Sequence, residues 1–151
     1  HCCRECQNPV TWDPDGGLFF DEKAKEEIFS QLDKPYISGI TFSGGDPMHS
    51  ANRPTVRSLM AQIRQRYPDK TIWMYTGDVW ENVRGDSIMR YVDVLVDGEF
   101  QVDKKDAQLL WKGSSNQRVI DVQRSLALPQ GAEPVLHCGD YSEGWVKGWK
   151  Q

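Results

Sequence analysis

The fold class follows from residues 37–47, which read ISGITFSGGDP. Ile37–Ser43 is rich in the residues that favour a short strand, and the strand ends at Gly44-Gly45. Two glycines and an acid, Asp46, therefore follow a strand directly. Parallel α/β sheets bind their ligands at this end of their strands. Taken alone, however, the pattern fits a plain strand-to-helix turn better than a ligand site.

The elements on both sides of this stretch alternate between strand and helix. Apolar residues recur at helical spacing, prolines mark helix ends, and continuous apolar runs indicate strands covered on both faces. Such alternation predicts βαβ units and an α/β fold with a mainly parallel sheet. The predicted helices span residues 21–34, 54–68 and 80–90, and the further predicted strands span residues 72–75, 92–96 and 119–122.

The ends of the chain have a different character. Residues 1–18 hold cysteines and then the turn-rich sequence DPDGG at 13–17, which predicts a loop. After about Leu126 the sequence is rich in glycine and proline. No internal repeat is visible. We therefore expect one domain with its core at residues 1–124 and an irregular C-terminal tail at residues 125–151.

Length and charge restrict the class of protein. A chain of 151 residues is long enough to bury the core of one domain. Its formal net charge of −4 argues against a surface for nucleic acid or membrane, because phosphate binding needs a basic face. No apolar run approaches the length of a membrane span, and no signal segment opens the chain. We therefore expect a cytoplasmic protein.

Three of the four cysteines, Cys2, Cys3 and Cys6, lie within the first six residues. In a cytosolic chain this grouping indicates a metal or redox site rather than disulfides. The spacing Cys3-x-x-Cys6 occurs in zinc ribbons, iron–sulfur sites and redox pairs, so a structural zinc half-site has equal weight here. No second C-x-x-C completes a zinc ribbon, and the further donors, His137 and Cys138, lie in the predicted tail.

The order of these features is more specific than any one of them. A cysteine loop, a helix and a strand ending in Gly-Gly-Asp resemble the radical S-adenosylmethionine (SAM) superfamily. More narrowly, they resemble the anaerobic ribonucleoside-triphosphate reductase-activating proteins, in the same order over roughly residues 1–124. The matching segments are 1–9 (HCCRECQNP) with Thr11-Trp12, 38–49 (SGITFSGGDPMH), 69–77 (DKTIWMYTG), 94–100 (VLVDGEF) and 111–121 (WKGSSNQRVID).

This resemblance implies both a fold and a reaction. The fold is a partial, open βα-barrel of the radical SAM type. The cofactors are SAM and a 4Fe–4S cluster held by three cysteines of a C-x3-C-x2-C loop. The reduced cluster cleaves SAM, and the resulting radical removes a hydrogen atom from a glycine of the anaerobic reductase. The implied partners are that reductase and an electron donor such as flavodoxin.

The resemblance also assigns cluster ligands. Cys3 and Cys6 match the second and third cysteines of the family loop. The first would lie two positions before His1, so we expect that cysteine and the first strand to lie outside these 151 residues. Cys2 falls on a spacer position and is not expected to be a ligand.

Contacts with SAM follow from the same comparison of residues. Gly45 matches the glycine beside the methionine part of SAM, with Gly44 and Asp46 as its neighbours. Relatives usually carry an aromatic residue at the position of Gln7, so an aromatic stacking contact with SAM is not expected at this position. The residues expected to touch SAM are Glu5, Cys6, Gln7 and Gly45.

Two alternatives remain open at this point. One is another small radical SAM enzyme that acts on a metabolite, as a deazaguanine-forming synthase does. The stretch WKGSSNQ at residues 111–117 favours the activating enzyme. The other is a non-catalytic metal-binding module built on Cys3 and Cys6. No residue is assigned a catalytic role from the sequence.

Overall fold

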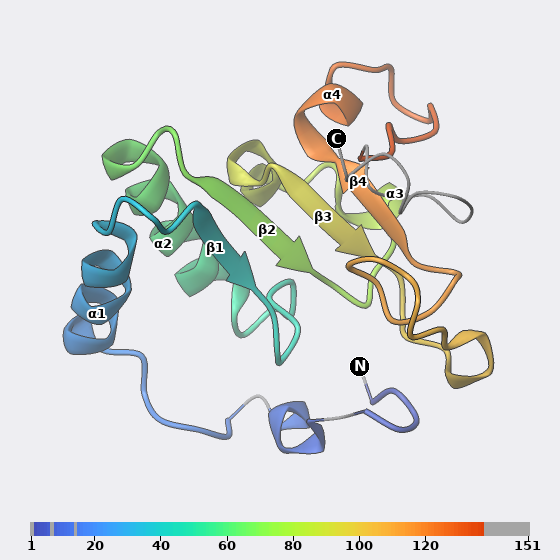
Figure 1. The fold of residues 1–151 in the computed structure, drawn as a ribbon, viewed down its shortest axis with the longest axis horizontal. Coiled ribbons are helices and arrows are strands. Elements are labelled where there is room, and N and C mark those ends of the chain that lie inside the picture. The colour runs from blue at the N-terminus through green and yellow to red at the C-terminus, as the bar shows by residue number, and fades with distance from the viewer. Residues whose placement is uncertain (1, 7, 14, 138–151) are drawn as a thin grey trace.

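A computed structural model describes residues 2–6, 8–13 and 15–137. Its described part contains one four-stranded sheet in the order β1-β2-β3-β4 (Figure 1). The first three strands run parallel, and β4 is antiparallel to β3. The alternating helices and strands confirm the α/β class, and the three parallel strands confirm the mainly parallel sheet. The sheet is open rather than closed into a barrel (Figure 1). The strands are β1 (Gly39–Phe42), β2 (Thr71–Tyr75), β3 (Val94–Asp97) and β4 (Arg118–Asp121).

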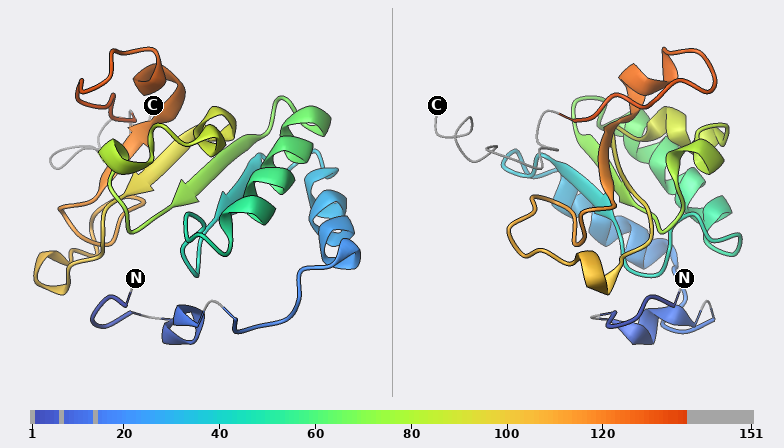
Figure 2. Two further views of the ribbon diagram at one scale, coloured as in Figure 1. Left: turned by 180° about the vertical axis from the view of Figure 1, so that it is seen from behind. Right: turned by 90° about the vertical axis from the view of Figure 1, so that its right-hand side faces the viewer.

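Helices cover one face of this sheet (Figure 2). The two long ones, α1 and α2, bring apolar side chains onto the sheet, where they form the main core. Burial of this apolar surface stabilises the fold. The helices are α1 (Glu22–Leu32), α2 (Arg53–Arg66), α3 (Trp80–Val83) and α4 (Val122–Leu126), and the 3-10 turns are η1 (Pro9–Trp12), η2 (Ser87–Tyr91) and η3 (Val102–Lys104). Fully buried core side chains include Met60, Ile63, Ile72, Met74 and Leu95.

The long helices begin and end close to where the sequence predicts. The side chain of Asp21 accepts a hydrogen bond from the Ala24 amide at 2.9 Å, which satisfies a free donor of the first turn of α1. Pro54 lies in the first turn of α2, where its missing amide hydrogen costs nothing. The predicted helices 21–34 and 54–68 are thus confirmed to within a few residues.

The predicted helix at residues 80–90 is wrong in its continuity. The helix α3 ends at Val83, and a separate 3-10 turn, η2, begins after Gly85. The side chain of Asp86 accepts from the Ile88 amide at 2.9 Å, so it starts the new turn locally. The cap and the glycine together favour two short elements over one helix.

Helix α4 was not predicted. It starts at Val122, the last residue of the predicted strand 119–122, because the side chain of Asp121 accepts a hydrogen bond from the Arg124 amide at 3.1 Å. Farther on, the Asp121 amide donates to the Val135 carbonyl, and the His137 amide donates to Val119, both at 2.8 Å. A division of the chain at residue 124 stays a prediction, and α4 spans that position.

Residues 98–117 form a long loop on the face opposite α1 and α2 (Figure 2). Trp111 packs edge-on against Trp73, with their ring centroids 4.9 Å apart, and His137 joins both rings. The Tyr75 hydroxyl donates to the Trp111 carbonyl at 2.6 Å. These contacts hold the loop against the ends of the strands. No helix among the described residues is long and apolar enough to cross a membrane.

Candidate functional site

A cavity of about 180 Å³ lies where β1, β2 and β3 end. The carboxyl ends of parallel strands meet at one edge of a sheet, and loops leaving that edge can surround a ligand. The N-terminal segment passes beneath the arrowheads of these strands in Figure 1 and forms the opposite wall. Residues from five separate parts of the chain therefore meet here. They include Cys3, Cys6, Trp12, Gly45, Thr76 and Gly98.

Cys3 and Cys6 lie on one tight turn. The Cys6 amide donates to the Cys3 carbonyl at 3.2 Å, and Glu5 between them has a left-handed backbone with φ of 56°. Both cysteines are free thiols and both line the cavity. The Asn8 amide donates to the Cys6 sulfur at 3.4 Å. Hydrogen bonds of this kind to sulfur tune iron–sulfur clusters, so the turn has the right donor set for one.

Cys3 also contacts the loop that follows β3. Its thiol donates to the Glu99 carboxylate at 3.7 Å. Burial raises the pKa of the Cys3 thiol, and the negative charge of Glu99 raises it further. Among the described residues, no group of three or more histidine, cysteine, aspartate or glutamate side chains could hold a metal ion. The described part of the chain thus places two free thiols at this cavity.

The glycine pair after β1 fits closely beneath the N-terminal segment. Gly44 has φ of 96°, a conformation that favours glycine. A Cβ atom on Gly45 would lie 3.0 Å from the Thr11 carbonyl oxygen, which is tighter than ordinary contact. A side chain at position 45 would therefore push the two walls of the cavity apart.

Asp46 joins the ends of two strands. Its carboxylate accepts from the Thr76 hydroxyl at 2.9 Å and from the Gly77 amide at 2.9 Å. It also accepts from the Met48 amide at 2.9 Å. These bonds orient both carboxylate oxygens toward the protein. The acid after the glycine pair therefore fixes the walls of the cavity by linking β1 to β2.

Asp97 has a similar role at the end of β3. It is only 1 % exposed, and it accepts from the Trp80 amide at 2.7 Å and from the Arg118 amide and guanidinium. Arg118 also pairs with Glu81 at 2.9 Å. The hydrogen bonds that the Arg118 guanidinium donates, to Asp97 and then to Glu81, raise the pKa of Arg118, and its bond to Glu81 lowers the pKa of that carboxyl. Asp97 therefore ties α3 and β4 to β3, while the next residue, Gly98, lines the cavity.

The polar stretch at residues 114–118 folds the long loop onto the site. The Gln117 amide oxygen accepts from the Gly113 and Ser114 amides at 2.9 and 3.1 Å. Its amide nitrogen donates to the Gly98 carbonyl at 3.0 Å, and Gln117 lines the cavity. This side chain thus anchors the loop to the end of β3.

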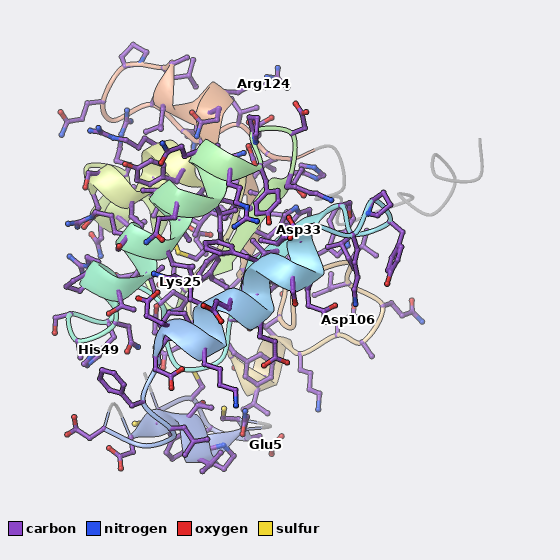
Figure 3. The ribbon with its side chains drawn as sticks, turned by 90° about the vertical axis from the view of Figure 1, so that its left-hand side faces the viewer. Glu5, Lys25, Asp33, His49, Asp106 and Arg124 are labelled. Atoms are coloured by element: carbon purple, nitrogen blue, oxygen red, sulfur yellow. The ribbon has the colours of Figure 1, made fainter. Side chains whose placement is uncertain are left out.

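The structure brings together three of the residues that the sequence singles out, namely Cys3, Cys6 and Gly45. Glu5 is exposed on the same turn and is not part of the cavity lining; Figure 3 labels it on the N-terminal segment. Gln7 and Cys138 lie outside the described residues.

Other lining residues were not predicted. Thr76 and Gly98 follow strands directly, so the rule that pointed to Gly45 could also have found them. Trp12, which belongs to the matching N-terminal segment but was given no role, is 42 % exposed and lines the cavity. Its place depends on the path of the N-terminal loop, which carries no periodic pattern.

Comparisons with known proteins point to one family. The family described as "4Fe-4S single cluster domain" matches residues 1–120. Three similar curated proteins are each named anaerobic ribonucleoside-triphosphate reductase-activating protein. That of Enterobacteria phage T4 is 37% identical over 79% of this chain and 76% of its own length. Those of Pasteurella multocida and Escherichia coli K12 are 38% and 39% identical, over 78% and 79% of this chain and 78% and 80% of their own lengths. No solved structure matches.

Proposed function

Because this chain belongs to the family of anaerobic ribonucleoside-triphosphate reductase-activating proteins, we propose that it activates such a reductase by generating a glycyl radical on it. One observation carries the proposal. Two free cysteines on a tight turn and the glycine pair after β1 line a single cavity at the carboxyl edge of the sheet. A cluster and a ligand bound to it would meet there.

We assign separate roles to the residues that line the cavity and to their neighbours on the cysteine turn. Cys3 and Cys6 would ligate the 4Fe–4S cluster. Gly45, Glu5, Cys6 and Gln7 contact SAM. When bound, the cluster and SAM supply the radical that removes a hydrogen atom from a glycine of the reductase. The chain's own residues position SAM between the glycine pair and the cysteine turn and keep water from it.

Whether the sheet extends into a partial βα-barrel depends on the free edge of β1. Beside it lies a second cavity of about 810 Å³, lined by apolar residues that include Leu18, Phe19 and Phe42. Leu18 and Phe19 are 99% and 90% exposed, although their side chains are large and apolar. We propose that a further strand pairs with β1 and covers these side chains. That strand would give the partial βα-barrel of the radical SAM type.

The proposed function also suggests an electron donor for the cluster and a cellular compartment for the reaction. A small flavoprotein such as a flavodoxin suits the role of electron donor, because the cluster takes up one electron at a time at low potential. The acidic chain favours protein partners over nucleic acid. We place the reaction in the cytoplasm, where reducing conditions keep thiols available for iron.

SAM binding and cleavage test this function. The reduced, anaerobically reconstituted protein should bind SAM and convert it to methionine and 5′-deoxyadenosine. Gly45→Val should weaken SAM binding by about tenfold or more, because its side chain collides with the Thr11 carbonyl wall. Isothermal titration measures the affinity, and iron analysis should show that the cluster is retained.

The matched control is Gly85→Val. Nothing lies within 4 Å of a Cβ atom built there, and its backbone is not left-handed. This variant should bind SAM as the parent does. A parent protein that binds its cluster but no SAM would overturn the proposed function. Equal affinity in Gly45→Val and parent would overturn only the placement of SAM.

A further inference from the structure

We propose that His49 is a positioning residue that donates a hydrogen bond from Nε2 to the methionine carboxylate of SAM. The inference rests on the proposed function. His49 follows the Gly-Gly-Asp turn and lines the same cavity as Cys3, Cys6 and Gly45. Figure 3 labels it on the loop after β1, above the N-terminal segment. Nothing in the sequence resemblance assigns this side chain a role.

The turn that carries His49 is held rigidly. The His49 amide donates to the Asp46 carbonyl at 3.0 Å, and the Arg53 amide donates to the His49 carbonyl at 3.0 Å. The guanidinium of Arg53 also donates to the Met48 carbonyl, through Nη2 at 2.7 Å. The backbone at position 49 is therefore fixed from both sides before any ligand binds.

The imidazole of His49 is oriented as well. Its Nδ1 accepts a hydrogen bond from the Ala51 amide at 3.2 Å. A ring nitrogen that accepts carries no proton, so the neutral imidazole bears its hydrogen on Nε2. Within the described part of the chain, no hydrogen-bond partner of Nε2 is found. The ring thus presents one donor, held at a fixed angle, at the wall of the cavity.

The surroundings of this donor favour an anionic group. Helix α2 begins at Arg53 with no side-chain cap, and the amino end of a 14-residue helix carries a partial positive charge. Among the described lining residues, Asp46 has the only carboxylate, and that group is bonded to Thr76 and Gly77. SAM carries one anionic group, its methionine carboxylate. The part of the cavity around His49 and the amino end of α2 therefore suits the methionine carboxylate of SAM.

Two substitutions separate a ligand contact from a local structural role. The side-chain amide of asparagine places its polar atoms near Nδ1, whereas that of glutamine reaches the position of Nε2. His49→Asn keeps the acceptor for Ala51 and loses the donor to the ligand. His49→Gln keeps a donor at the outer position. We expect His49→Asn to bind SAM about tenfold more weakly, and His49→Gln to stay within about threefold of the parent.

Isothermal titration of the cluster-loaded full chain decides the matter, with SAM and with decarboxylated SAM as probes. His49→Asn should leave affinity for decarboxylated SAM unchanged, because that probe lacks the carboxylate. Iron content and the thermal midpoint of each variant show whether cluster and fold are intact. The reverse order, with asparagine like the parent and glutamine weakened, overturns the inference and assigns His49 to the turn alone. Equal weakening toward both probes also overturns it. Failure of the parent to bind SAM overturns the proposed function instead.

Discussion

Replacing Cys6 with alanine should abolish the iron–sulfur cluster of this protein. Cys6 and Cys3 are held on one turn by the bond from the Cys6 amide to the Cys3 carbonyl, and both face the cavity. A cluster with three protein ligands loses a third of its thiolates when either is removed, and open iron then dissociates or is oxidised. We expect iron and sulfide content of the anaerobically reconstituted protein to fall to background in Cys6→Ala and Cys3→Ala. The broad visible absorption of the cluster should disappear with them.

Two other cysteines serve as controls for this experiment. Cys2 is exposed and does not line the cavity, so Cys2→Ala should retain full iron and sulfide. Cys138→Ala should do the same, because the family loop does not include that position. Undiminished cluster in Cys6→Ala would show that the ligand assignment is wrong. If Cys2→Ala loses the cluster and Cys3→Ala keeps it, Cys2 rather than Cys3 is the cluster ligand.

The largest loss of stability is expected for Asp97→Ala. Asp97 is almost fully buried and pairs with Arg118 while it accepts from the Trp80 amide. Removing its carboxylate leaves a part-buried guanidinium and buried amide hydrogens without their acceptor. Breaking a buried ion pair from one side typically lowers the free energy of unfolding by about 3–5 kcal/mol. Urea denaturation followed by circular dichroism measures this difference.

Glu81→Gln is the matched control for that variant. Glu81 pairs with the same guanidinium, but its side chain is 54% exposed. Exposed ion pairs contribute about 0–1 kcal/mol, so this variant should unfold close to the parent. If Asp97→Ala is no less stable than Glu81→Gln, the buried pair does not hold β3 to β4 and α3 as described.

Local sequence signals were enough to predict most of the fold. The helical spacing of apolar residues in 21–34, Pro54 and the apolar run at residues 72–75 each encode their own element, and the structure confirms them. The break at Gly85 and the start of α4 at Val122 depend on single side-chain caps, from Asp86 and Asp121. Such caps compete with a continuing helix or strand, and periodicity cannot resolve that competition.

The candidate site was predictable only in part. Cys3, Cys6 and Gly45 were identifiable because a motif and a strand end mark them. The hydrogen bond from Thr76 to Asp46 joins residues far apart in the chain, so the sequence could not reveal it. The sequence suggested that Asp46 lies beside the ligand, whereas in the structure its carboxylate links the ends of two strands. Trp12 and Gln117 reach the cavity through loops, and loop paths carry no periodic signal. Tertiary contacts, rather than local patterns, decide these roles.

Electron paramagnetic resonance detects directly whether this protein places a radical on a protein partner. The cluster-loaded protein is reduced and mixed anaerobically with SAM and the anaerobic ribonucleoside-triphosphate reductase. We expect a glycyl doublet on the reductase that requires SAM and is absent with Cys6→Ala. No radical on the reductase, while SAM is consumed together with a small-molecule substrate, would contradict the proposed function.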